Sequence, residues 1–221
     1  MKASDWNGYW KQAKGGRFTR VSWSKRRMER ILRPHLASGM DVLDAGCGSG
    51  YFSAFFQGEG CRVTALDRSE EALAIAREVT GNAAAEYTTD DLLDTAFGAA
   101  RRETFDLVFT DGLIEHFEPD VQRRLVANLI ACLRPGGLLA TFVPNLYSWW
   151  SLARPLVMPG IYEKPFRRAP LRALHEGDGL ALVEEGGLSV FPFAVSPEFL
   201  APRFGMIRYA LARKAKKGAR S

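Results

Sequence analysis

Positions 42–50, which read VLDAGCGSG, constrain the fold of this chain more than any other segment. A short apolar run ends there in three alternating glycines. Glycine tolerates positive φ and has no Cβ, so a glycine-rich turn after a strand lets the next helix begin close to a bound ligand. A dinucleotide-binding loop would place its last glycine at position 51, which is Tyr51 here. The acidic Asp44 also disfavours a pyrophosphate and favours a ligand with an ammonium group.

A second carboxylate follows where the next apolar run ends. Residues 62–67 read RVTALD, and residues 69–79 follow as a predicted helix with Ser69 as its N-cap. The carboxyl ends of parallel strands meet at one edge of a sheet, so Asp67 is expected across the crevice from the glycine loop. A carboxylate in that place accepts both hydroxyls of a ribose. The loop, Asp44 and Asp67 together predict a ligand that carries a nucleoside.

Apolar runs alternate with helical patterns through the middle of the chain, which is typical of βαβ units on a parallel sheet. The predicted strands of this region are 41–44, 62–67, 84–88, 105–110 and 138–143, and its predicted helices are 51–57, 69–79 and 119–133. The third helix is expected to stop at Pro135-Gly136-Gly137. After residue 170 the pattern predicts a helix at 171–183, strands at 188–193 and 206–212, and a frayed end from residue 214.

Composition excludes several classes of protein. The chain has 221 residues, 47% of them hydrophobic and 25% charged, which suits one globular domain with a sizeable core. No apolar run reaches the roughly 18 residues that a bilayer span needs, and the first residues lack the order of a secretory signal. Three widely spaced cysteines, at positions 47, 61 and 132, favour reduced thiols and a cytoplasmic setting over a disulfide framework.

Charge is unevenly distributed along the sequence. Residues 1–35 have a balance of +8, residues 36–140 of −9 and residues 141–221 of +6. The two basic ends suggest an anionic partner or substrate, although solvated lysines and arginines would give the same count.

Four motifs in this order and spacing, VLDAGCGSG, ALDRS, FDLVFTDGLIEHF and LRPGG, resemble the class I S-adenosylmethionine-dependent methyltransferases. The resemblance is close over residues 40–143. It implies an α/β fold with a Rossmann-like, mostly parallel seven-stranded sheet, helices on both faces and an antiparallel last strand, to which RYALARK at 208–214 is similar. It also implies S-adenosyl-L-methionine as cofactor and S-adenosyl-L-homocysteine as product.

The resemblance carries a cofactor site onto this sequence. The glycines would lie against the methionine and ribose portions, Asp44 near the amino end, Asp67 at the ribose hydroxyls and Arg68 beside the adenine. The family also places an acidic residue after the third strand, where it faces the adenine amino group. Counting from the predicted strand favours Asp90 for this role, whereas the similarity of DLLD to the family pattern favours Asp91. The full implied set is Asp44, Ala45, Gly46, Cys47, Gly48, Gly50, Asp67, Arg68, Asp90, Asp91, Leu92, Asp111 and Gly112.

TDGLIEHF at 110–117 follows the fourth predicted strand, where a transferred methyl group would emerge. Methyl transfer from a sulfonium needs alignment, desolvation and, where the acceptor carries a proton, a base. His116 is the histidine expected near this edge, and an imidazole suits a base at neutral pH. The alternative is that Glu115 and His116 only pack the loop. No His, Cys or carboxylate spacing in the sequence predicts a metal site.

Aromatic and basic residues are concentrated in the two segments that would cover the sheet. We expect a leading lid at 1–36, a cofactor-binding core at 37–143, an aromatic insertion at 144–170 and C-terminal strands and tail at 171–221, all in one domain. Their aromatics could bind an acidic or aromatic acceptor, stack nucleobases, or simply pack. The predicted substrate-binding residues are Tyr9, Trp10, Arg17, Asn145, Tyr147 and Trp150.

Three functions are compatible with these features. The sequence favours methyl transfer to a small, anionic or aromatic acceptor over methylation of RNA (tRNA) or protein through the basic ends. A cofactor-binding protein without catalysis is the third alternative, since a binding motif does not prove turnover. The acceptor atom and the oligomeric state do not follow from the sequence.

Overall fold

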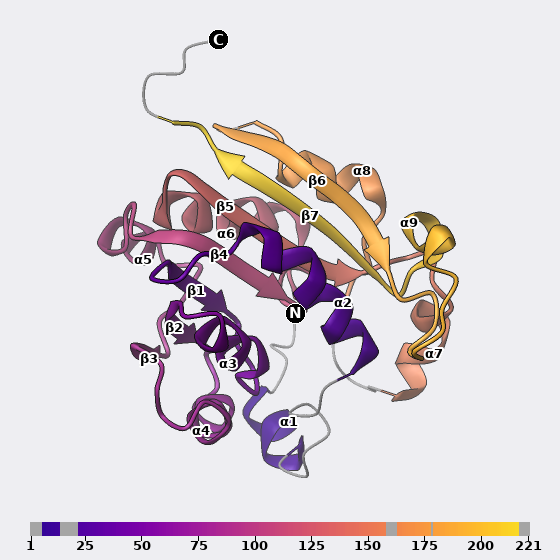
Figure 1. Ribbon diagram of the computed structural model, residues 1–221, viewed down its shortest axis with the longest axis horizontal. Coiled ribbons are helices and arrows are strands. Elements are labelled where there is room, and N and C mark those ends of the chain that lie inside the picture. The colour runs from indigo at the N-terminus through magenta and orange to yellow at the C-terminus, as the bar shows by residue number, and fades with distance from the viewer. Residues whose placement is uncertain (1–5, 14–21, 158–162, 178, 217–221) are drawn as a thin grey trace.

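The structure, a computed structural model, describes residues 6–13, 22–157, 163–177 and 179–216 (Figure 1). Seven strands form one sheet in the order β3-β2-β1-β4-β5-β7-β6. They are β1 (Asp41–Ala45), β2 (Arg62–Leu66), β3 (Glu86–Thr88), β4 (Phe105–Asp111), β5 (Leu133–Pro144), β6 (Leu180–Leu188) and β7 (Ile207–Lys214). The first five run parallel, and β7 lies antiparallel between β5 and β6. The predicted fold class is therefore confirmed.

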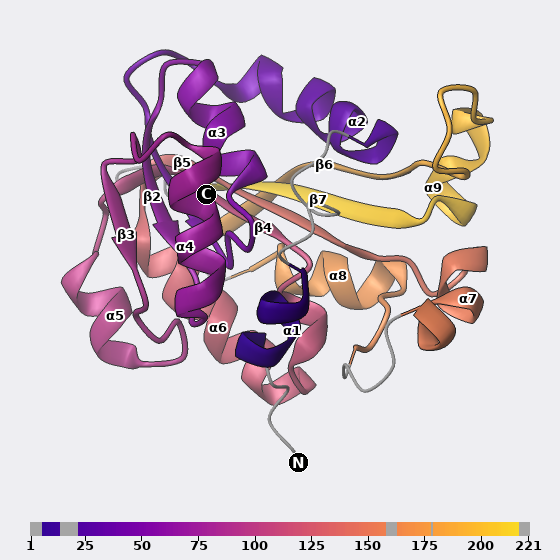
Figure 2. The same cartoon turned by 90° about the horizontal axis from the view of Figure 1, so that it is seen from below.

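Helices cover both faces of the sheet (Figure 2). Each face has its own apolar core, with Phe56 and Met28 on one side and Leu125 and Leu129 on the other. The α-helices are α1 (Trp6–Ala13), α2 (Trp23–Leu32), α3 (Tyr51–Gly58), α4 (Glu70–Val79), α5 (Thr95–Ala100), α6 (Pro119–Cys132), α7 (Trp149–Val157), α8 (Arg168–Leu174) and α9 (Ala201–Phe204). The 3-10 turns are η1 (Arg33–His35), η2 (Ile114–His116) and η3 (Glu198–Leu200). None of the helices in the described ranges is both long enough and apolar enough to span a bilayer.

Helix α4 begins as its sequence predicts. The Ser69 hydroxyl accepts the N–H of Ala72, and Glu70 and Glu71 lie in the first turn, where they favour the positive end of the helix dipole. This cap places the start of α4 directly beside Asp67, because the carboxylate of Asp67 accepts the N–H of Ser69 at 2.9 Å.

The Pro135-Gly136-Gly137 run does not end α6. The helix stops at Cys132, and Leu133 is already extended with ψ 137°, so that β5 includes the whole run. The register between β4 and β5 slips there, with Phe105 opposite Leu133 but Leu107 opposite Leu138. A bulge of this kind tolerates a proline, since its residues make no regular ladder hydrogen bonds.

Two further predictions in the C-terminal third are wrong. Residues 171–183 are not one helix, because α8 ends at Leu174 and β6 begins at Leu180. The strand expected at 188–193 is β6, and it ends rather than begins at Leu188, since Ser189 has a positive φ of 60°. The expected frayed end lies largely outside the described residues, but Lys214 is the last residue of β7.

Candidate active-site cleft

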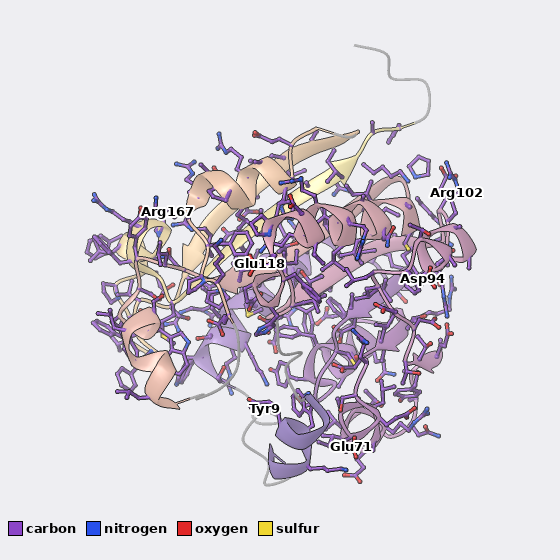
Figure 3. All side chains as sticks on the ribbon, turned by 180° about the vertical axis from the view of Figure 1, so that it is seen from behind. Tyr9, Glu71, Asp94, Arg102, Glu118 and Arg167 are labelled. Atoms are coloured by element: carbon purple, nitrogen blue, oxygen red, sulfur yellow. The ribbon has the colours of Figure 1, made fainter. Side chains whose placement is uncertain are left out.

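A cleft of about 900 Å³ lies at the carboxyl ends of the parallel strands. Figure 3 labels Tyr9 and Glu118, which line it from α1 and from the residue before α6. The cleft combines the glycine loop with acidic residues from three strand ends and with aromatic side chains from the covering helices. Its main lining residues are Tyr9, Trp10, Lys25, Asp44, Gly46, Cys47, Gly48, Asp67, Arg68, Asp91, Leu92, Asp111, Gly112, His116, Arg124, Trp150 and Met206.

The glycine loop is held against the end of β2 by its own backbone. The N–H groups of Gly46 and Cys47 both donate to the carbonyl of Leu66 at 2.8 Å. Gly46 and Gly48 have φ values of +76° and +52°, and a Cβ on Gly48 would lie 2.8 Å from the ring of Trp10. Both the conformation and the space therefore require glycine at this position.

Asp44 is a buried carboxylate at the base of the cleft, with only 2% of its surface exposed. Its pKa is raised to about 7, chiefly by burial and also by the charges of Asp111 and Asp67, against hydrogen bonds from the Ser53 hydroxyl, at 2.6 Å, and from the Ser53 backbone. Burial likewise raises the pKa of Asp111 to about 6, with Lys25 opposing. Carboxylates that repel one another in a low-dielectric site form a place that stabilises a cation.

Asp67 joins the glycine loop to the start of α4. One carboxylate oxygen accepts the N–H of Gly48 at 2.9 Å and the other accepts that of Ser69 at 2.9 Å. Burial raises the pKa of Asp67, and these two backbone donors oppose the change. Each oxygen of a carboxylate has more than one acceptor site, so Asp67 can also accept hydroxyl groups from a ligand in the cleft.

The structure separates the two acidic residues that the sequence left as alternatives. Asp91 lines the cleft together with Leu92, and its carboxylate lies 4.0 Å from Arg68. Asp90 is not among the lining residues, and its carboxylate accepts a hydrogen bond from Arg101, the residue after α5, at 3.2 Å. The geometry therefore favours Asp91 as the residue that faces a ligand.

Two residues of the implied cofactor set lie behind the cleft instead of lining it. Ala45 is fully buried as the last residue of β1. Gly50 has a φ of +74°, and a Cβ there would lie 2.7 Å from the Cα of Ala76 in α4. Gly50 is thus required for the close packing of α3 against α4, and it is not among the residues that line the cleft.

The predicted substrate residues are only partly brought together. Tyr9, Trp10 and Trp150 line the cleft, whereas Asn145 and Tyr147 do not. The buried amide of Asn145 donates to backbone carbonyls of residues 203 and 205, at 2.9 and 2.8 Å, and so fixes the turn before β7. The side chain of Tyr147 is 53% exposed outside the cleft. Arg17 lies outside the described residues.

His116 lies in η2 at the wall of the cleft, close to two carboxylates. Its imidazole and the carboxylates of Glu115 and Glu163 bring their donor atoms within 4.8 Å of one another. The N–H of Lys164 donates to the carbonyl of Glu115 at 2.9 Å, which ties the chain around residue 163 to η2. This group can share a proton or hold a cation. Sequence spacing could not reveal it, because Glu163 is far from His116 along the chain.

Comparisons with known proteins identify the kind of domain that carries this cleft. Residues 42–137 match a family described as a methyltransferase domain. The malonyl-[acyl-carrier protein] O-methyltransferase of Pectobacterium atrosepticum is 35% identical over 117 residues, 53% of this chain and 43% of that protein. A ubiquinone biosynthesis O-methyltransferase of Aromatoleum aromaticum is 33% identical over 111 residues, 50% of this chain and 47% of that protein.

The fold is also similar to that of solved structures. An S-adenosylmethionine-dependent methyltransferase from Mesorhizobium loti superimposes with a TM-score of 0.67 at 21% identity, over 84% of this chain and 96% of that one. The chain covers 43%, 37% and 37% of the lengths of the first three curated relatives that it matches. The chain therefore spans less than half of the length of these relatives.

Proposed function

Because residues 42–137 belong to the S-adenosylmethionine-dependent methyltransferase domains, we propose that this protein transfers a methyl group from S-adenosyl-L-methionine to a small acceptor. The observation that carries the proposal is the pair of buried carboxylates, Asp44 and Asp111, whose pKa values are raised beside the glycine loop. S-adenosyl-L-methionine carries an ammonium and a sulfonium, and a cation there relieves the repulsion between these carboxylates.

The other residues of the cleft match the remaining parts of this cofactor. Asp67 accepts ribose hydroxyls at the end of β2, while Leu92 offers an apolar surface and Asp91 an acceptor to the adenine. Arg68 lies beside Asp91 at 4.0 Å, so it borders the same part of the cleft. When bound, the cofactor supplies a methyl group on a sulfonium, which an aligned acceptor atom takes by in-line displacement.

The covering residues position the acceptor and exclude water. Trp10 packs over Gly48 and is only 9% exposed, and Trp150 lines the cleft from α7. His116 takes the proton of the acceptor, and the neighbouring carboxylate of Glu163 stabilises the imidazolium that results. Lys25 and Arg124 line the same cleft and favour an anionic acceptor.

A cytoplasmic setting completes the proposal and rests on the cysteines. All three, Cys47, Cys61 and Cys132, are buried free thiols. Burial raises the pKa of each, which keeps the unreactive thiol form. The sheet and its helices also support the proposed division into a cofactor-binding core, 37–143, and covering segments on either side.

Calorimetry with S-adenosyl-L-homocysteine tests the cofactor part of the proposal. We expect micromolar binding to the wild type and a loss of about 2–3 kcal/mol for Asp67→Ala, typical of hydrogen bonds to a charged group. Asp90→Ala is the matched control, because it removes a neighbouring carboxylate that does not line the cleft, and its affinity should be unchanged. Absence of both heat and a thermal shift with the wild type would refute cofactor binding.

A salt titration tests the acceptor part against RNA. Binding of a protein to tRNA through phosphates weakens steeply as the salt concentration rises. We expect no such salt-dependent binding at low salt, and its detection would favour RNA over a small acceptor.

A further inference from the structure

One end of the molecule exposes an unusual number of large apolar side chains. Helices α7 and α9 lie together there in both views (Figures 1 and 2). Several large apolar side chains on α7 and between β6 and β7 are 41–88% exposed. We call the following six residues the apolar end: Leu152, Leu156, Phe193, Val195, Phe199 and Phe204. Single exposed apolar residues are ordinary, but a group of this size marks an interaction surface.

Hydrogen bonds fix the backbone of this end in place. The indole N–H of Trp149 donates to the carbonyl of Val190 at 2.8 Å, which ties α7 to the chain after β6. The guanidinium of Arg27 donates to the carbonyls of Phe193 and Ala194 at 3.0 and 3.2 Å. These polar groups are thus satisfied within the protein, and the apolar side chains are left facing outward.

The charge around the apolar end is positive. Arg167 and Arg203 are both exposed, and within the described ranges neither of them forms an ion pair. The bridge between Asn145 and Phe166, and the bond from the Asn145 amide to the carbonyl of Arg203, bring the two arginines to the same region. Figure 3 labels Arg167 toward this end of the molecule. The acidic Glu198 is already paired with Arg27 at 3.2 Å.

We propose that the apolar end binds the surface of a bilayer that contains anionic lipids. Its most exposed side chains, Leu152, Leu156, Val195 and Phe199, are 83–88% exposed and come from α7, from η3 and from the segment between β6 and η3. Such protruding side chains suit insertion among acyl chains and headgroups, whereas a peptide or a ligand tail would need a groove. Exposed arginines beside them attract anionic headgroups.

Two residues that line the cleft are close in the chain to residues of the apolar end. Trp150 of α7 and Met206, directly before β7, both line the cleft, while neighbouring residues of the same elements face outward. A methyl acceptor dissolved in the lipid surface would therefore enter the cleft from the side of the apolar end. This last step rests on the proposed methyl transfer, but binding to the bilayer does not.

Co-sedimentation with vesicles tests the proposal on the full chain without any cofactor. We expect partition onto vesicles of phosphatidylcholine with about one third phosphatidylglycerol, weaker partition onto phosphatidylcholine alone, and weakening by salt. The double variant Leu152→Gln/Leu156→Gln should lose about a hundredfold in partition, since each buried leucine contributes about tenfold. Val183→Gln, on β6 and 47% exposed, is the matched control and should partition like the wild type.

Three further readouts make the outcome decisive. The double variant must bind S-adenosyl-L-homocysteine as the wild type does, which shows that it is folded and separates this test from that of the proposed function. Arg167→Gln/Arg203→Gln should remove most of the preference for phosphatidylglycerol vesicles. Wild-type protein that stays in the supernatant, equal partition of the double variant, or a wild-type dimer in ultracentrifugation that the double variant loses would each overturn the proposal.

Discussion

Asp44 is the residue whose substitution best separates stability from binding, because its carboxylate is buried in a cleft that suits a cation. Its pKa is about 7 in the folded chain against an ordinary value of 3.8. That difference corresponds to about 4 kcal/mol, which is the upper value for the destabilisation by the ionised carboxylate. An asparagine in its place would keep an acceptor for the Ser53 hydroxyl without the buried charge. We therefore expect Asp44→Asn to stabilise the ligand-free protein.

The pH dependence of stability follows from the direction in which folding shifts the pKa of Asp44. Because the pKa of Asp44 is higher in the folded state, the folded protein holds an extra proton between about pH 4 and pH 7. The contribution of Asp44 to stability therefore falls as the pH rises through this window and is constant above it. In thermal unfolding without ligand, Asp44→Asn should be more stable than wild type by about 2–4 kcal/mol at pH 8, or about 4–16 °C. At pH 4 the two proteins should unfold at similar temperatures.

Binding should change in the opposite direction. Asp44→Asn removes a charged partner of the ligand's ammonium, so its affinity for S-adenosyl-L-homocysteine should fall by about ten- to a hundredfold at pH 8. Asp90→Asn is the control, because its carboxylate does not line the cleft and is 46% exposed, and it should change neither property. A variant that is less stable than wild type at pH 8, or that binds equally well, would refute the reasoning.

Three other substitutions address the remaining parts of the cleft and core. Gly48→Ala should lower the unfolding temperature and weaken binding, because its Cβ would lie 2.8 Å from the Trp10 ring; unchanged calorimetric and thermal values would contradict this. His116→Gln should lower kcat by about 10²–10⁴-fold with the binding constant of S-adenosyl-L-homocysteine unchanged. EDTA should leave wild-type turnover unchanged. A loss of turnover that Mg²⁺ restores would instead show that Glu115, His116 and Glu163 bind a cation. Burial lowers the pKa of His175 to about 4, so its contribution to stability is complete above about pH 6.5 and falls toward pH 4. His175→Gln should lack this loss of stability at low pH. The measurement is the difference in unfolding free energy between variant and wild type at each pH, because Asp44 changes the stability of both proteins in the opposite direction over the same pH range.

The parts of the site that the sequence predicted are those set by local rules. The glycine loop and Asp67 each lie at the end of a short buried strand, and the strand fixes where they point. Hydrophobic periodicity located these strands, and the parallel arrangement then brought their ends together. The N-cap of α4 is local in the same sense, since Ser69 bonds a residue three positions away.

The parts that the sequence could not predict depend on distant partners. Asp90 is drawn away from the cleft by Arg101, which follows α5, a short helix around Gly98 that periodicity did not reveal. Glu163 reaches His116 only because the chain after α7 returns to η2. Pairing of β6 with β7 likewise overrides the helix-favouring leucine, alanine and glutamate residues at 180–185.

Burial, more than charge count, decides where a cation would bind. The segment 36–140 has a balance of −9, but many of its carboxylates face solvent, where water and salt screen them. Asp44 and Asp111 differ because their burial is the largest cause of their raised pKa values. The sequence predicted a ligand with an ammonium group from Asp44 beside the glycine loop, and in the folded chain Asp44 and Asp111 concentrate the negative charge there. Substituting an exposed acidic residue of the same segment that does not line the cleft, such as Asp94, should leave cofactor affinity unchanged for the same reason.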